Sequence, residues 1–192
     1  MKCKILGNKI KPFMNFGKMP LANAFLSKDQ FSKEFFFDMK VGFSEKLSLF
    51  QLNDHPSPKQ MFNKNYPFFT GSSDYMKEHF KKYANWIKQN YVDNSSKIIE
   101  IGSNDGTFLS YFDLNIDNYL GIEPSKSVAD FAIKKKIKTL NDFFSYNLSR
   151  ELTKFKKKTD VVVGANVICH IPDLVDLIKG VDNLLSKKGV FI

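Results

Sequence analysis

Short apolar strands alternate with helical segments along the second half of the chain, and this alternation is the strongest constraint on its fold. From residue 95 onward, apolar runs of four or five residues are followed by amphipathic stretches. Such alternation predicts βαβ units, which build a parallel sheet covered by helices. We expect strands at 97–101, 118–122, 137–140, 160–164 and 189–192, and helices at 106–112, 125–134, 146–155 and 173–185. In such a sheet, ligands bind outside the carboxyl ends of the strands.

A different kind of sequence precedes this part. Residues 1–62 carry short apolar runs broken by Gly, Pro and Asn, which predicts a small β-rich module with a strand pair within 35–52. Residues 72–91 repeat aromatic and apolar side chains at spacings of three and four, so we expect a helix there. The expected domains are therefore the module at 1–62, an active-site loop and linking helix at 63–94, and a sheet domain at 95–192.

The first motif with chemical meaning is a glycine-containing loop directly after the first expected strand. It consists of Glu100, Ile101, Gly102, Ser103, Asn104, Asp105 and Gly106. The two glycines allow positive φ and a close approach of the backbone to a ligand, and the N-terminus of the helix expected to follow offers free N–H groups. The spacing is not G-x-G-x-x-G and no Walker lysine follows, which argues against dinucleotide and P-loop sites.

Further polar side chains follow the next expected strands. Glu123, followed by Pro124, ends the second strand, and a carboxylate at this place can accept both hydroxyls of a ribose. Asp142 and Phe143 follow the third strand, where an acidic side chain and an aromatic ring can flank a nucleobase. Asn166 lies in the loop after the fourth strand. We expect these residues, together with those of the glycine loop, to bind a cofactor.

These motifs, in this order, resemble those of the class I S-adenosylmethionine (SAM)-dependent methyltransferases. Longer segments narrow the resemblance to the sugar C-methyltransferases, which act on nucleotide-linked 3-keto-deoxysugars. Residues 164–173 (GANVICHIPD) are similar to their A-N-x-x-C-H-I-P-D segment, and residues 66–80 (YPFFTGSSDYMKEHF) to their Y-x-Y-x-S-S…S…M-x-x-H-F segment. Residues 17–25 match their G-x-x-P-L-x-n-x-F stretch.

The resemblance implies a Rossmann-like α/β fold, with five of the family's seven strands present after the N-terminal module. It implies SAM as the cofactor and the formation of a C–C bond, in which a base removes the proton α to a ketone and the enolate attacks the methyl group. Tyr66 and His170 would line the active site and donate hydrogen bonds to the keto or enolate oxygen. The family's Y-H-E-H segment, which carries the base, would follow residue 192, so we expect the chain to be a fragment.

The N-terminal module departs from the family that it resembles. The family's module contains a four-cysteine zinc site built from two C-x-x-C pairs. Here the first pair runs from Cys3 to Leu6 and the second from Ser44 to Leu47, so three of the four thiolates are replaced. Because structural zinc takes four ligands, we expect neither zinc nor another metal site, and a module held together by apolar packing.

The net charge of +9 arises from 29 basic and 20 acidic side chains, and Arg150 is the sole arginine. Because base readout and bidentate phosphate contacts favour arginine, the lysines favour a solvated surface over an anionic ligand, and argue against nucleic acid. No apolar run approaches the ~20 residues of a membrane span, and no signal-peptide core is visible. Two cysteines fit a reducing compartment, so we expect a cytoplasmic protein with no membrane partner.

The sequence therefore predicts a SAM-dependent methyltransferase whose small-molecule substrate is a nucleotide-linked keto-deoxysugar. Two alternatives stay open. One is a cofactor-binding remnant without turnover, and the other is a methyltransferase that acts on a different small molecule. The sequence leaves the oligomeric state open as well.

Overall fold

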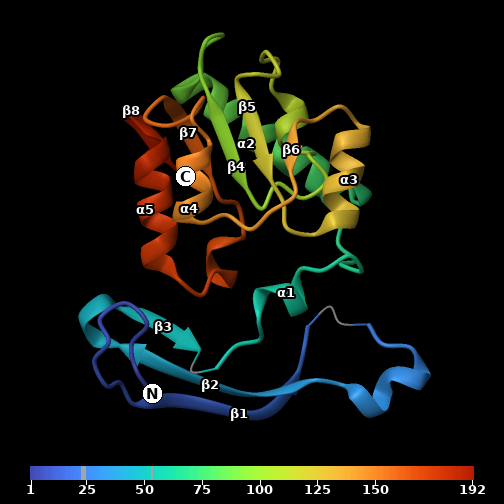
Figure 1. The fold of residues 1–192 in the computed structure, drawn as a ribbon, viewed down its shortest axis with the longest axis vertical. Helices are drawn as coiled ribbons and strands as arrows, with labels where there is room; N and C mark the ends of the chain where they lie inside the picture. The colour runs from blue at the N-terminus through green and yellow to red at the C-terminus, as the bar shows by residue number, and fades with distance from the viewer. Residues whose placement is uncertain (23–24, 53) are drawn as a thin grey trace. The chain divides into compact units, whose positions relative to one another are not determined.

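The computed structural model describes residues 1–22, 25–52 and 54–192 (Figure 1). Residues 23–24, which belong to the 17–25 segment singled out above, lie outside the described residues. The chain divides into two compact units, Met1–Phe62 and Asn63–Ile192.

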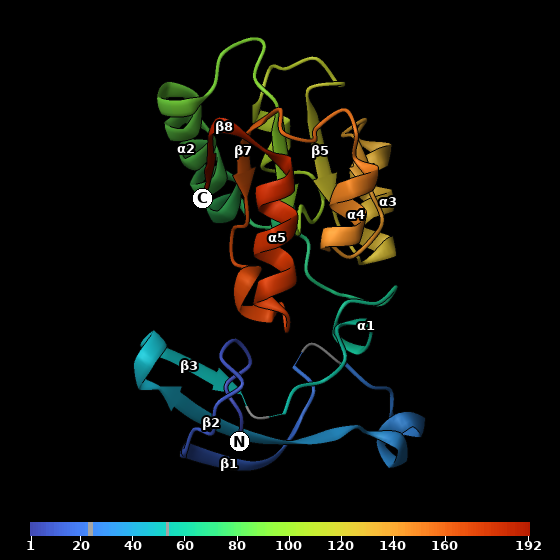
Figure 2. The same cartoon turned by 60° about the vertical axis from the view of Figure 1, so that its left-hand side comes forward.

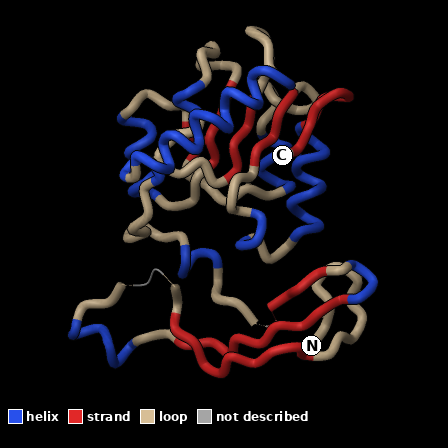
Figure 3. Tube along the Cα trace, turned by 180° about the vertical axis from the view of Figure 1, so that it is seen from behind, coloured by secondary structure: helices blue, strands red, loops and turns tan. Residues whose placement is uncertain are grey.

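The N-terminal unit is built on a three-stranded antiparallel sheet in the order β1-β2-β3 (Figure 3). Its elements are β1 Pro12–Pro20, a 3-10 turn Lys28–Lys33, β2 Phe36–Ser44, a 3-10 turn Glu45–Leu47, β3 Leu49–Leu52 and a helical turn α1 Pro58–Met61. The β2–β3 hairpin matches the expected strand pair. Strand β1 was not predicted, because two register shifts and Gly17, at φ +73°, interrupt the period-two pattern that identifies a strand.

The C-terminal unit contains the predicted Rossmann-like parallel sheet (Figure 1). Its five strands lie in the order β6-β5-β4-β7-β8, and each neighbouring pair is parallel. The strands are β4 Ile98–Ile101, β5 Tyr119–Ile122, β6 Thr139–Leu140, β7 Thr159–Val163 and β8 Leu185–Phe191. The chain first builds outward from β4 to β6 and then returns to place β7 on the other side of β4. Strand order therefore reverses beside β4, where an open α/β sheet binds its ligand.

Helices pack on both faces of this sheet (Figure 2). They are α2 Asp74–Tyr91, α3 Lys126–Lys134, α4 Tyr146–Glu151 and α5 Leu174–Leu184. Ser73 caps α2 by accepting the Met76 N–H at 3.3 Å. None of the helices in the described residues combines the length and the apolar character that crossing a membrane requires.

The helix predicted at 106–112 is wrong. This stretch forms turns and a single 3-10 turn, Leu109–Tyr111. Gly106 has φ +75°, outside the α-helical region, and Phe112 already has extended backbone angles, so too few residues lie between them for an α-helix. The last strand also differs from expectation, because β8 begins at Leu185, directly after α5.

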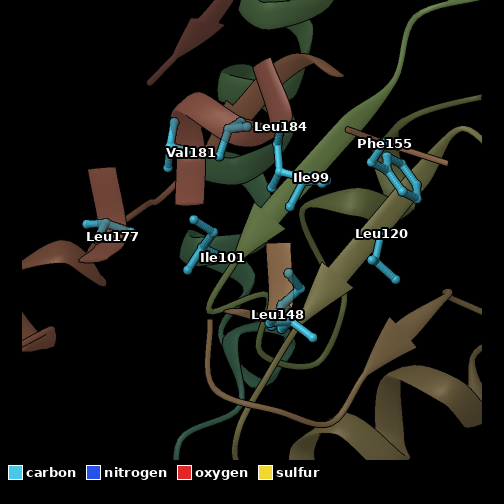
Figure 4. Close-up of a cluster of buried hydrophobic side chains, with 10 residues drawn as sticks. Ile99, Ile101, Leu120, Leu148, Phe155, Leu177, Val181 and Leu184 are labelled. Atoms are coloured by element: carbon cyan, nitrogen blue, oxygen red, sulfur yellow. The ribbon is translucent and has the colours of Figure 1, made fainter. Parts of the chain in front are cut away.

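Two apolar cores sandwich the sheet, and successive β4 side chains alternate between them. Ile99 and Ile101 pack with residues of β5, α4, α5 and the turn after α4, including Leu120, Leu148, Phe155, Leu177, Val181 and Leu184 (Figure 4). Ile98 packs in the other core with Ala84 and Ile87 of α2 and with Phe108. Burying each large aliphatic side chain contributes roughly 1.5–3 kcal/mol, so the sheet is a firm frame for the loops at its carboxyl edge.

Candidate cofactor site

The loop after β4 has the backbone conformation that its glycines predict. Gly102 and Gly106 have φ of +69° and +75°, and Asn104 between them has φ +50°. A Cβ atom on Gly102 would come within 2.7 Å of Val167 Cγ2, in the loop after β7. Glycine is therefore required at this position, both for the left-handed backbone and for the close approach of the two loops.

Two buried carboxylates stand at the carboxyl ends of β4 and β5. Glu100 and Glu123 are each 4% exposed, and Glu100 pairs in register with Gly121, two residues before Glu123. Burial raises the pKa of Glu100 well above its usual range, and the negative charges of Glu123 and Asp105 raise it further. Burial also raises the pKa of Glu123, although the N–H donors around it act in the opposite direction. The edge of the sheet is thus a desolvated acidic site.

The Glu123 carboxylate accepts one main-chain hydrogen bond on each oxygen. Oε2 accepts the Asn104 N–H at 3.0 Å, and Oε1 accepts the Ser125 N–H at 2.7 Å. An ionised carboxylate has about four acceptor positions, so both oxygens can accept further hydrogen bonds. The main chain therefore orients Glu123 and leaves it able to bind a pair of hydroxyl groups.

The loop after β6 lies beside Glu123. Asn141 Nδ2 donates to the main-chain carbonyls of Glu123 and Pro124, at 2.8 and 2.9 Å. Asp142 and Phe143 follow directly, and Asp142 Oδ1 accepts the Phe143 N–H at 2.7 Å. The Asn141 side chain thus brings the acidic and aromatic pair expected from the sequence to the same edge of the sheet.

Several buried polar atoms of this region have no hydrogen-bond partner within the part of the chain that the structure describes. They are Glu100 Oε2, Ser103 Oγ and Ser127 Oγ. A buried polar group without a partner costs about 1–3 kcal/mol, so native structures seldom retain one without a reason. Their gathering in and after the loops of β4 and β5 indicates that a polar ligand binds there.

The side chains of Asn104 and Asp105 bind the main chain of Thr70 and Gly71. The Thr70 N–H donates to Asn104 Oδ1 at 2.8 Å, and the Gly71 N–H donates to Asp105 Oδ2 at 2.9 Å. Both side chains hold the segment that precedes α2, and the Asn104 main-chain N–H is the group that reaches Glu123. Sequence reasoning missed this contact because its partners are 34 residues apart and no local pattern marks them.

Comparison with known proteins agrees with this arrangement. Residues 99–191 match the model of a family described as "Methyltransferase domain", and residues 3–62 match one described as "Putative zinc binding domain". Residues 99–191 are therefore similar to methyltransferase domains, and we refer to residues 63–192 as the methyltransferase domain. The unpartnered hydroxyl and carboxylate oxygens beside Glu123 fit a ligand with hydroxyl and amino groups, such as SAM.

Individual relatives give the same picture of the methyltransferase domain. The C-methyltransferase NovU from Streptomyces niveus is 23% identical over 99% of this chain and 46% of its own length, so the chain spans less than half of that relative. A proposed SAM-dependent methyltransferase from Methanococcus maripaludis has the same fold, with a TM-score of 0.52 and 14% identity over 72% of this chain and 66% of that one.

The two residues expected on the substrate side of the methyltransferase domain have different environments. Tyr66 is half-buried, and its pKa is raised by burial and by the nearby charge of Glu123. His170 is exposed in the 3-10 turn Ile168–His170 after β7. Asn166 lies just before this turn, exposed, with φ +55°. The structure therefore brings Tyr66 toward Glu123 and places His170 and Asn166 in the loop that contacts Gly102 through Val167.

The residues of the N-terminal unit do not fit a zinc ion. Cys3 is buried, and its Sγ accepts hydrogen bonds from Gln51 Nε2 at 3.2 Å and from the Leu6 N–H at 3.4 Å. These hydrogen bonds lower the pKa of the Cys3 thiol to about 7, and the bond from Gln51 has the largest effect. The Leu6 side chain has no atom that can ligate a metal. The described residues contain no group of three or more His, Cys, Asp or Glu side chains that could hold a metal ion.

Proposed function

We propose that the chain is part of a SAM-dependent enzyme that methylates a carbon atom of a nucleotide-linked keto-deoxysugar through an enolate. The observation that carries this proposal is the pair of buried carboxylates, Glu100 and Glu123, beside a positive-φ glycine loop with unpartnered polar atoms. NovU, whose name is that of a C-methyltransferase, supports the reaction class. The resemblance of residues 164–173 to the sugar C-methyltransferases supports the substrate class.

The cofactor side is assigned to the loops after β4, β5, β6 and β7. When bound, SAM supplies an electrophilic methyl group. Glu123 accepts the ribose hydroxyls, and Glu100, whose raised pKa falls when a cation approaches, faces the positively charged amino end. The remaining residues assigned to the cofactor are Gly102, Ser103, Asn104, Asp105, Gly106, Pro124, Asp142, Phe143 and Asn166, with Asn104 and Asp105 contributing their main chain only.

The substrate side is assigned to Tyr66 and His170. Because burial and the Glu123 charge raise the pKa of Tyr66, its phenol keeps its proton and can donate a hydrogen bond to the oxygen that becomes negative in the enolate. A neutral His170 can donate in the same way. The proton-accepting base is not assigned to a residue of this chain.

Calorimetry with S-adenosylhomocysteine tests the cofactor assignment. Glu123→Ala should weaken binding by about 1–3 kcal/mol, since it removes a charge-assisted set of hydrogen bonds. Glu151→Ala, which replaces an exposed glutamate of α4, is the matched control and should bind as the wild type does. Equal affinity for the two variants would remove Glu123 from the site, and absence of binding at millimolar ligand would overturn the proposal.

Mass spectrometry with nucleotide keto-sugars tests the reaction, using the protein encoded by the complete reading frame. SAM should yield a product heavier by one CH2 unit. Without SAM, enolate formation should exchange the proton α to the ketone for solvent deuterium. A product methylated on oxygen or nitrogen, or a methylated product without α-proton exchange, would contradict the enolate route.

A further inference from the structure

The segment that carries the active-site tyrosine is fastened to the cofactor loop by two consecutive residues. We propose that Asn104 and Asp105 are positioning residues, which clamp residues 68–71 onto the glycine loop, and that Asn104 couples this clamp to Glu123. The clamp stands on contacts alone, whereas its catalytic meaning rests on the function proposed above for Tyr66 and Glu123.

Asn104 uses its main-chain N–H and both polar atoms of its side chain. Its main-chain N–H donates to Glu123 Oε2 at 3.0 Å. Its side-chain Oδ1 accepts the Thr70 N–H at 2.8 Å, and its Nδ2 donates to the Phe68 carbonyl at 3.1 Å. The residue has φ +50°, a conformation that asparagine adopts more readily than most residues. One residue thus joins the carboxylate assigned to the ribose with the segment that leads from Tyr66.

Asp105 completes the attachment one residue further on. It is 1% exposed, and its Oδ2 accepts the Gly71 N–H at 2.9 Å and lies 3.4 Å from Lys135 Nζ. Its Oδ1 accepts the Thr107 hydroxyl at 2.6 Å and the Thr107 N–H at 3.2 Å. With both oxygens engaged in this way, the Asp105 carboxylate serves the clamp.

Aromatic packing supports the same segment from α3. The Phe69 ring meets the Phe131 ring edge to face, with centroids 5.5 Å apart, and Lys135 Nζ lies 4.5 Å from the Phe131 centroid. Phe68, Phe69, Thr70 and Gly71 are therefore each held by a separate contact. Because Tyr66 lies two residues before this run, the clamp restricts where its main chain lies and hence the region that its phenol can reach.

Because Asn104 contacts both Glu123 and residues 68–71, ligand binding at Glu123 and closing of the clamp affect each other equally. If ligand hydroxyls on Glu123 favour the clamped state, the clamped state favours the ligand by the same factor. Because Thr70 and Gly71 donate their N–H groups only into the clamp bonds described above, amide exchange at these residues measures how often the clamp opens. S-adenosylhomocysteine should slow both exchange rates about fivefold or more, at the lower end of usual coupling.

Amide exchange followed by NMR tests the clamp in the chain without ligand. Asn104→Gly keeps the left-handed backbone and the N–H to Glu123 but removes the side chain, so exchange at Thr70 should rise about tenfold, as for one lost hydrogen bond. In Asp105→Asn, one of the two carboxylate oxygens becomes an NH2 group, which cannot accept a hydrogen bond. Either the Gly71 N–H or the Thr107 N–H then loses its acceptor, so amide exchange should rise at one of these two residues. Asn141→Ala, which loses bonds to the Glu123 and Pro124 carbonyls, is the control and should leave Thr70 unchanged.

The outcomes separate the clamp from the proposed function. Unchanged exchange at Thr70 in an Asn104→Gly variant that melts as the wild type does would overturn the clamp. Ligand binding that leaves Thr70 and Gly71 exchange unaltered would overturn the coupling. Failure to bind S-adenosylhomocysteine would count against the proposed function, while exchange in the ligand-free chain would still decide the clamp. In the complete enzyme, Asn104→Gly should lower kcat more than it raises the KM for SAM, and the reverse would contradict a positioning role.

Discussion

Each unit of the chain contains a cluster of buried polar side chains, and the two clusters differ in whether those side chains have hydrogen-bond partners. In the N-terminal unit, Gln51 donates to Cys3 Sγ and accepts the Lys4 N–H at 2.8 Å, so one amide ties β3 to the N-terminal turn. Ser44 Oγ is the exception there among the described residues. In the methyltransferase domain, by contrast, Glu100 and Ser103 lie buried with oxygens that have no partner in the described chain.

Gln51 and Cys3 form a polar cluster that stabilises the fold, whereas Glu100 and Ser103 form one that is suited to binding a ligand. Gln51 and Cys3 satisfy each other, so the free energy of their interaction belongs to the stability of the unit itself. Glu100 and Ser103 are desolvated without compensation, so they lower stability in the free protein and regain it when a ligand supplies partners. The predictions below test this contrast, beginning with the largest effect.

Gln51→Leu should weaken the N-terminal unit most. The variant loses both amide hydrogen bonds, at about 1 kcal/mol each, so opening of the unit becomes about 30-fold more frequent. The measurement is the rate at which a thiol reagent labels buried Cys3, with exposed Cys169 as the fast internal reference. Gln89→Leu, at an exposed position of α2, should leave the rate unchanged, and equal rates in both variants would break the comparison.

Glu100→Gln should change how the stability of the methyltransferase domain depends on pH. Since the folded-state pKa of Glu100 is raised, the folded state binds more protons than the unfolded state between the ordinary glutamate value and the raised one. Stability therefore falls as pH rises through that window, and glutamine abolishes the fall. Thermal unfolding measured across this pH window should show a higher melting temperature for the variant at the upper end of the window. The rise should be about 2–4 °C per kcal/mol of stability recovered. The exposed Glu151→Gln is the control, and parallel pH curves for Glu100→Gln and wild type would contradict the idea.

Ser103→Ala and Ser149→Ala form a matched pair of buried serines. Ser149 Oγ donates to the Tyr146 carbonyl at 2.6 Å and accepts from Asn183 Nδ2 at 3.1 Å, whereas Ser103 Oγ has no partner in the described chain. Removing the satisfied hydroxyl should lower the free energy of unfolding by about 1 kcal/mol, and removing the unsatisfied one should leave it equal or higher. Ser103→Ala should also weaken S-adenosylhomocysteine binding in calorimetry. Equal destabilisation of the two variants would refute the distinction.

Metal removal should have the smallest effect. Because Cys3 is engaged by Gln51 and Leu6, and three family cysteines are replaced, a chelator should produce no measurable shift in the unfolding of the N-terminal unit. Elemental analysis of the purified protein checks the same point. Stoichiometric zinc, or unfolding on chelation, would place the N-terminal unit among metal-dependent folds.

The sheet could be predicted from the sequence because buried parallel strands need continuous apolar runs, and these runs stand out between amphipathic helices. The strand that escaped prediction, β1, contains Gly17 and two register shifts, so the order of its side chains carries no clear period. The helix expected after the glycine loop failed for a related reason. Gly106, which suits the loop, takes a backbone conformation in which an α-helix cannot begin.

The candidate site was predictable in part. Glycine and carboxylate positions follow from strand ends, which the sequence marks, and the structure brings Glu100, Glu123 and the loop of Asn141 to one edge of the sheet. The turning of the Asn104 and Asp105 side chains toward Thr70 and Gly71 depends on a tertiary contact between separate segments. Sequence spacing contains no information about such a contact.

The clamp also bears on how the protein ages. An Asp-Gly bond such as that between Asp105 and Gly106 rearranges to isoaspartate when the glycine nitrogen attacks the side-chain carboxyl. Here the Gly106 N–H donates to the Ser103 carbonyl at 3.1 Å, and the Asp105 carboxyl is held by Thr107 and Gly71. The bonds that fasten the tyrosine segment therefore also engage both groups that would react, so we expect isoaspartate to form more slowly in the folded chain than in the unfolded chain.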